Sequence, residues 1–169
     1  MAITNLSVPS NVPTHAVPYD YDQAFSLAQT VTASAWLGNQ QTQITMGPGR
    51  MEGYWVLDIA ALALGSSNET YQFFLCGSND PNFGNGNVEL LAMHDFAPTS
   101  ALRVLPTILG VSPSDPQTGL NATRHVIPFS NLMGYNLFEY LQLYALIAGT
   151  SPSVTLSSWL APFTGMSNG

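Results

Sequence analysis

Hydrophobic and polar residues alternate with a period of two in three consecutive segments, which is the pattern of β-strands with one face in a core. The segments cover residues 54–60, 70–76 and 88–96. Residues 77–87, between the last two segments, are rich in Gly, Asn, Asp and Pro, which favour tight turns. No helical periodicity interrupts the series, so the pattern predicts antiparallel strands and an all-β domain.

Four further segments have the composition of strands, at residues 41–46, 124–129, 138–148 and 153–160. The segment 138–148 differs from the others because both of its alternating faces are apolar. We expect it to be a central strand, covered on one side by a second sheet and on the other by an arm or another subunit. A total of seven or eight strands predicts an antiparallel β-sandwich or jelly roll.

The amino-terminal part of the chain is predicted to be an extended arm. Residues 1–21 contain Pro9, Pro13 and Pro18 and have no charged side chain before position 20. Proline restricts φ and removes a backbone donor, so such a segment favours an extended conformation over a packed core. The remaining residues, 22–169, are predicted to form a single β-sandwich domain.

Two stretches have a less regular pattern. Residues 22–36 begin with a sequence that suits a short helix and continue with β-branched residues that favour extension, so both interpretations stay open. Residues 97–123 form a long irregular connection with four prolines, and loops of this length usually have a function or are disordered. The connection contains Leu105, Ile108 and Leu109, and we expect these residues to lie against the domain or a neighbouring protein.

The chain contains very few charged residues. They make up 8% of the sequence, against about 25% in a typical protein, and lysine is absent. Arg50, Arg103 and Arg124 are the only permanent cations beside ten carboxylates. Removing water from a neutral polar surface costs little free energy, which suits a protein packed against other subunits. The alternative interpretation is a secreted or phage-encoded domain that simply has a neutral surface. The net charge of −7 argues against a nucleic-acid partner.

The cysteine count and the first residues bear on the cellular compartment. Cys76 is the only cysteine, so the chain has no internal disulfide, and we expect its thiol in the core. The first residues lack the basic and apolar regions of a signal peptide. The longest apolar runs are too short to span a bilayer. These features predict a protein made and folded in a reducing cytoplasm.

One distinctive sequence spans parts of three predicted strands and the segments between them. It comprises residues 55–59, 65–75, 77–80 and 88–93, together with Phe83. A Glu-Thr-Tyr strand is followed there by a Gly-Ser-Asn-Asp turn and a second apolar strand. This arrangement resembles small capsid decoration proteins, or cement proteins, of tailed bacteriophages.

The resemblance implies a jelly-roll domain that forms a homotrimer on the outer surface of a phage head and clamps neighbouring subunits of the major capsid protein. It implies a virion protein without catalytic residues or cofactors, which is made in the host cytoplasm. Its expected partners are the major capsid protein and other copies of itself, with no nucleic acid and no membrane. The residues expected at these contacts are Leu105, Ile108, Leu109, Tyr140, Tyr144, Pro9, Pro13 and Pro18.

Residue types that bind metals occur without the spacing that such sites use. His94 and His125 would suit a metal site in a jelly roll of the cupin kind, but no His-x-His or Glu pattern accompanies them. The sequence from Asp80 resembles the start of a calcium loop, yet its twelfth position is Leu91 instead of an acidic residue. Turn formation explains this stretch better. No nucleophile elbow or phosphate loop occurs, so we predict that the protein is not an enzyme.

An alternative function is that of a carbohydrate-binding module on a phage particle. Aromatic side chains can stack on sugars, and the Asn and Asp residues of the 77–87 loop can supply hydrogen bonds. Aromatic residues within strands more often belong to a sandwich core, which is our expectation for Trp55 and Tyr71. The aromatic candidates for sugar binding are Trp36, Trp55, Trp159, Tyr135, Tyr140 and Tyr144.

Overall fold

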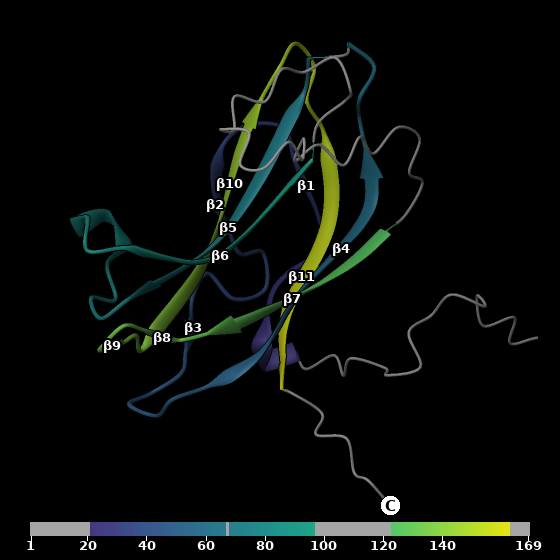
Figure 1. Ribbon diagram of the computed structural model, residues 1–169. Coiled ribbons are helices and arrows are strands. Elements are labelled where there is room, and N and C mark those ends of the chain that lie inside the picture. Colours follow the sequence, from purple (N-terminus) through teal and green to yellow (C-terminus); the bar gives the residue numbers. More distant parts are fainter. Residues whose placement is uncertain (1–20, 67, 97–122, 163–169) are drawn as a thin grey trace, which may run out of the picture.

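The protein is a sandwich of two antiparallel β-sheets that face each other across a common core (Figure 1). A computed structural model describes residues 21–66, 68–96 and 123–162. The first sheet has the strand order β1-β11-β4-β7, with bounds Ala24–Val31, Val154–Pro162, Glu52–Leu62 and Thr123–Ser130. The second has the order β2-β10-β5-β6, with bounds Ala35–Leu37, Tyr140–Ala148, Thr70–Ser78 and Glu89–Phe96.

The strand order is that of a jelly roll. The antiparallel pairs β1–β11, β2–β10, β4–β7 and β5–β6 are nested, the first strand pairing with the last and the middle two with each other. A chain that folds back on itself once makes these pairs, and wrapping the resulting ribbon divides them between two sheets. The predicted all-β sandwich or jelly roll is therefore confirmed.

Most of the predicted strands are present. The segments at 54–60, 70–76, 88–96, 124–129, 138–148 and 153–160 correspond to β4, β5, β6, β7, β10 and β11. The expected strand at 41–46 is only the two-residue β3 (Ile44–Thr45), which pairs with β10 beside β2. Segment 22–36, for which two interpretations were open, contains the single 3-10 turn η1 (Tyr21–Gln23), then β1 and the start of β2.

The alternation of side chains places one face of the central strands in the core. Trp55, Leu57 and Ile59 of β4 are buried, as are alternate residues of β5 and β10 on the facing sheet. The indole N–H of Trp55 donates to Ser158 Oγ at 2.8 Å, so the polar atom of this core side chain is satisfied. The expectation that Trp55 and Tyr71 belong to the core is confirmed.

Tyr71 also connects the two sheets. It belongs to β5, and its hydroxyl donates to the carbonyl oxygen of Ala63, which follows β4 in the other sheet. The backbone N–H of Ser153, just before β11, donates to the same hydroxyl at 3.0 Å. Desolvation by burial raises the pKa of Tyr71, so the hydroxyl keeps its proton and can donate and accept together.

An irregularity near the start of β1 changes the pairing of this strand with β11. The register shifts between Ser26 and Gln29, and Ala28 within this bulge has a φ of +46°. The backbone N–H of Ala28 donates to Ser157 Oγ at 2.9 Å, which satisfies a donor that the ladder has lost. The hydrogen bond of Ala28 is therefore kept, although its backbone adopts the left-handed conformation, which is unfavourable for alanine.

Candidate binding surface

Three aromatic side chains and a methionine form a row across the outer face of the β2-β10-β5-β6 sheet. Tyr144 of β10 pairs with Trp36 of β2 on one side and with Phe74 of β5 on the other, and Phe74 pairs with Met93 of β6. Directly opposite residues of neighbouring strands point to the same face. The Trp36 and Tyr144 rings meet edge to face with centroids 4.9 Å apart, and the Phe74 and Tyr144 centroids are 6.5 Å apart.

An apolar depression of about 270 Å³ lies over this row. Two of its lining residues are well exposed for large apolar side chains, Trp36 at 40% and Leu90 at 43%. Cys76 also lines the depression but is itself buried, and burial raises the pKa of its thiol to about 11. The thiol is therefore protonated at neutral pH and acts as part of the apolar lining, not as a nucleophile. The complete lining is Trp36, Phe74, Cys76, Val88, Leu90 and Tyr144.

The loop between β5 and β6 holds Trp36 from a second side. Its short turn η2 (Phe83–Asn85) buries Phe83, whose ring meets the Trp36 ring edge to face at 5.4 Å between centroids. Asn82 caps this turn by accepting from the backbone N–H of Gly84. The indole of Trp36 is consequently fixed between Phe83 and Tyr144.

Asp80 organises the same loop from within. Its carboxylate accepts from the side-chain amide of Asn85 at 2.6 Å and from the backbone N–H of Asn82 at 2.8 Å. These two hydrogen bonds, the first contributing more, hold the pKa of Asp80 below its ordinary value. The carboxylate thus has the role expected for turn formation, and among the described residues no group of three or more His, Cys, Asp or Glu is arranged to hold a metal ion.

A larger polar cavity of about 540 Å³ adjoins the apolar depression. Val88 lines both hollows, which therefore lie next to each other. Asn87, Glu89 and Asn136 are exposed in the polar cavity and present amide and carboxylate groups to solvent. The complete lining is Asn79, Asp80, Gly86, Asn87, Val88, Glu89, Asn136 and Phe138.

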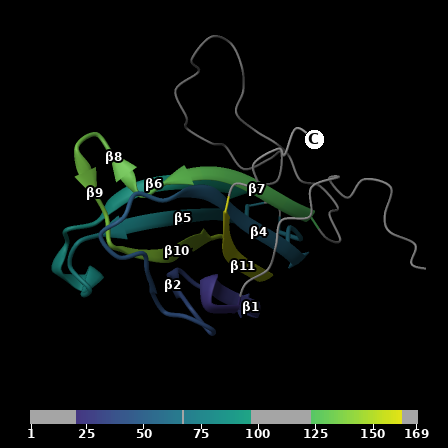
Figure 2. The same cartoon turned by 90° about the horizontal axis from the view of Figure 1, so that it is seen from below.

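A small hairpin that the sequence analysis did not predict contributes Asn136 to this cavity. Strands β8 (Leu132–Met133) and β9 (Asn136–Leu137) are joined by a two-residue turn in which Gly134 has a φ of +61°. Figure 2 shows the hairpin at the end of the sandwich where the β5–β6 loop also lies. Its turn residue Tyr135 is fully exposed, and Met133 is 43% exposed.

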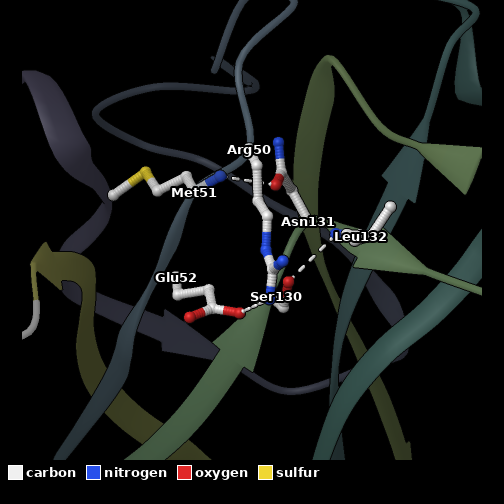
Figure 3. A network of polar contacts seen from close by, with 6 residues as sticks. All are labelled: Arg50, Met51, Glu52, Ser130, Asn131 and Leu132. Carbon is white, nitrogen blue, oxygen red and sulfur yellow. Dashed lines mark hydrogen bonds and ion pairs between the residues drawn. The ribbon is translucent and has the colours of Figure 1, made fainter.

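The hairpin is anchored by a buried asparagine (Figure 3). The side chain of Asn131 accepts from the backbone N–H of Met51 at 2.7 Å and donates to the carbonyl oxygens of Gly49 and Phe138 at 2.9 and 3.0 Å. Ser130 adds a hydrogen bond from the N–H of Leu132 to its Oγ. The base of the hairpin is thereby tied to the turn before β4.

The outer face of the other sheet carries Trp159, which is only 3% exposed. The guanidinium of Arg124 lies 5.3 Å from the centre of its ring and also forms an ion pair with Asp58 at 2.8 Å. Arg50, the other described arginine, forms an ion pair with Glu52. Both described cations are therefore paired with carboxylates.

The two histidines that the sequence suggested as a metal pair do lie together. The rings of His94 on β6 and His125 on β7 have centroids 4.3 Å apart, and the ring of Phe96 lies edge to face against each of them. The pair closes one edge of the sandwich, where β6 and β7 from different sheets come into contact.

The structure separates the aromatic candidates for sugar binding into distinct groups. Trp36 and Tyr144 come together at the depression, while Trp55 and Trp159 are buried and unavailable for stacking. No described segment covers the outward face of β10 at Leu146, which is 42% exposed. The expected covering of this strand on both sides is therefore not seen within the described residues.

Six of the residues that the sequence analysis expected at protein contacts lie outside the described residues. They are Pro9, Pro13, Pro18, Leu105, Ile108 and Leu109.

Comparison with known proteins identifies no relative: no protein family, no curated protein and no solved structure matches this chain. Among the residues that the structure describes, no helix is long and apolar enough to cross a membrane. Fold and surface chemistry are accordingly the basis for assigning a function.

Proposed function

We propose that this protein is a non-enzymatic structural virion protein that binds the outside of a phage head as a homotrimer and stabilises the lattice of the major capsid protein. The observation that carries the proposal is the jelly-roll strand order, an architecture that recurs in capsid and lectin domains. The resemblance of residues 55–93 to capsid decoration proteins points in the same direction.

The distribution of charge supports a role in a large assembly. Charged residues make up 8% of the chain, and both described arginines are already paired with carboxylates. Covering such a surface leaves few isolated charges to be dehydrated, and that dehydration is the main cost of burying polar surface. A protein with this surface can form wide contacts built from amides, hydroxyls and apolar side chains.

The β8–β9 hairpin is the described element best suited to contact the shell. Tyr135 and Met133 project from it, and Asn131 fixes its base. An exposed tyrosine on an anchored hairpin provides a large contact area with little loss of side-chain entropy, and tyrosine is frequent at the centres of interfaces. Binding that engages neighbouring capsid subunits together favours the assembled lattice over its separate parts by mass action.

The proposal is tested on virions from the culture that produces this protein. We expect mass spectrometry to find the chain in purified particles and cryo-electron microscopy to place a labelled copy on the outside of the head. Heads stripped of the protein should release DNA at a lower temperature and recover when it is added back. Absence from the particles, or heads whose release temperature is independent of the protein, would contradict the proposal.

A matched pair of variants tests the hairpin. Tyr135→Asp places a charge at the proposed contact and should reduce the number of copies bound to stripped heads. Leu27→Asp is the control, because Leu27 is exposed to 45% but lies on β1 in the other sheet. Equal binding of both variants at the wild-type level would exclude the hairpin as the contact.

A further inference from the structure

We propose that Asn85 is a site of spontaneous chemical modification, at which loss of ammonia converts an amide that stabilises the β5–β6 loop into a carboxylate that disrupts it. The reacting groups are the side chain of Asn85 and the backbone N–H of Gly86, which follows it in the loop. The modification site goes beyond the proposed attachment to a phage head, since it concerns how long one loop of the folded chain keeps its shape.

The reaction uses water and needs no other reactant. The backbone nitrogen of Gly86 attacks the side-chain carbonyl carbon of Asn85 and closes a five-membered succinimide ring. The new C–N bond replaces the bond to the amide nitrogen, which takes up the proton of the Gly86 N–H and leaves as ammonia. Water then adds to one of the two ring carbonyls and breaks its bond to the ring nitrogen. Residue 85 becomes an aspartate or an isoaspartate, and the chain gains one negative charge.

The first argument is the identity of the residue that follows Asn85. A side chain on the following residue crowds the attacking nitrogen and restricts its backbone, whereas glycine does neither. Among the asparagines that the structure describes, Asn85 alone precedes a glycine. Asn82, Asn87 and Asn136, which are equally exposed to solvent, precede Phe, Val and Leu. Ring closure is therefore least hindered at Asn85.

The second argument is that the reacting groups are accessible. Asn85 and Gly86 are both exposed, and no atom lies within 4 Å of the place that a Cβ of Gly86 would occupy. The N–H of Gly86 makes only a long hydrogen bond, 3.5 Å to the carbonyl oxygen of Phe83. The Asn85 side chain is held by hydrogen bonds with Asp80 and Asn82, but these are exposed bonds within a loop, where local opening requires little free energy.

The third argument is the effect of the product on the contact that organises the loop. The amide nitrogen of Asn85 donates to Asp80 Oδ2 at 2.6 Å, and the hydrogen bonds that Asp80 accepts keep its carboxyl group ionised at neutral pH. A carboxylate at position 85 has no proton to donate and brings a second negative charge to the same place. The modification therefore replaces an attraction between residues 80 and 85 by a repulsion.

The disruption extends to an aromatic contact of the outer sheet face. Asn85 ends the turn η2, and Phe83 at the start of this turn meets the Trp36 ring edge to face at 5.4 Å between centroids. An isoaspartate also lengthens the main chain within the turn by one methylene group, which shifts the Gly86 cap. We expect Phe83 to leave Trp36 after the modification, so that the indole becomes more exposed. The reaction is thus a slow, one-way change of this surface.

The test incubates the purified full-length protein, without capsids, in mildly alkaline buffer and follows the product by peptide mapping. Cleavage by chymotrypsin after Phe83 and Leu90 releases a peptide that contains Asn85 and Asn87, and fragmentation in the mass spectrometer tells the two apart. We expect modification at Asn85 to be at least about tenfold faster than at Asn87 or Asn136. Equal rates at the three positions, or an unmodified Asn85, would overturn the proposal.

Variants then separate the reaction from its structural effect. Asn85→Gln keeps an amide but disfavours the five-membered ring, so it should stay unmodified. Asn85→Asp introduces the charge of the product and should change the tryptophan fluorescence in the same direction as incubation of the wild-type protein. Asn87→Asp is the matched control, because it adds the same charge to the loop without replacing the partner of Asp80, and it should leave the fluorescence unchanged. The change should also be absent in a folded Trp36→Phe background. Wild-type fluorescence of Asn85→Asp, or equal effects of Asn85→Asp and Asn87→Asp, would overturn the proposed disruption.

Discussion

The side-chain amide of Asn131 accepts a hydrogen bond from the backbone N–H of Met51 at 2.7 Å, which joins the end of β7 to the start of β4 over 80 residues of sequence. The backbone repeats the connection in the opposite sense, since the N–H of Asn131 donates to the carbonyl oxygen of Met51 at 3.1 Å. Because Asn131 is fully buried, its polar groups depend on partners within the protein, which also include the carbonyl oxygens of Gly49 and Phe138.

We expect Asn131→Ala to destabilise the protein by about 3 kcal/mol, because it leaves the N–H of Met51 and the carbonyl of the buried Phe138 without their side-chain partner. Urea unfolding followed by tryptophan fluorescence measures this loss. Asn136→Ala, at an exposed position of the same hairpin, is the control and should change little. Equal stabilities of the two variants would refute the structural role of Asn131.

Tyr71→Phe should lower the free energy of unfolding by about 1–3 kcal/mol. The substitution keeps the ring in the core but removes the hydroxyl that binds Ala63 and Ser153 of the opposite sheet. Tyr135→Phe removes a hydroxyl from a fully exposed residue and should have almost no effect. Thermal unfolding of both variants checks the difference, and a Tyr71→Phe protein as stable as wild type would show that the hydroxyl contributes nothing.

Ala28→Gly is expected to stabilise the protein by about 0.5 kcal/mol. Alanine at a φ of +46° is strained by roughly 1–2 kcal/mol, and this gain exceeds the extra chain entropy that glycine loses on folding. Ala60→Gly, at an exposed strand position, should destabilise by about 0.5–1 kcal/mol because only the entropic cost remains. Chemical denaturation measures the change in the free energy of unfolding for each variant, and the two changes should have opposite signs.

The Cys76 thiol should react slowly with Ellman's reagent in the native protein. Its pKa of about 11 lies two units above the ordinary value of 9.0, so the thiolate fraction at pH 8 is about 100-fold lower than in the unfolded chain. The measurement compares reaction rates with and without denaturant, and the absence of other cysteines makes the signal specific. Comparable rates in both states would show that the thiol is not shielded.

The same raised pKa predicts the pH dependence of stability. A thiol with a higher pKa in the folded state binds more protons there between about pH 9 and 11, so its contribution is complete below pH 9 and is lost as pH rises. Cys76→Ala should reduce this alkaline loss. An identical alkaline profile for both proteins would refute the assignment.

The proposed attachment to phage heads is expected to be nearly insensitive to salt. Screening weakens exposed charge pairs over a Debye length of about 10 Å at 0.1 M, whereas contacts made by amides and apolar side chains are not screened. We expect occupancy on purified heads to stay constant between low salt and about 1 M sodium chloride. A steep loss of copies would instead indicate an acidic surface of this protein bound to a basic shell.

The sequence by itself determined the fold class and most of the long strands. Trp55, Leu57 and Ile59 alternate with more polar or smaller residues, and this local pattern follows directly from the opposite directions of successive side chains in a strand. The same reasoning placed Trp55 and Tyr71 in the core, where they lie. Short elements such as β8 and β9 carry too few residues for a period to be recognised.

The tertiary structure alone decided which side chains meet. Trp36 and Tyr144 are separated by more than 100 residues, and only the pairing of β2 with β10 puts them on one face. Asn131 reads as an ordinary turn residue in the sequence, and its burial depends on the hairpin closing over it. The physical reason is that side-chain direction along a strand is a local property, whereas strand order and the burial of a polar group are set by the free energy of closing the whole sandwich.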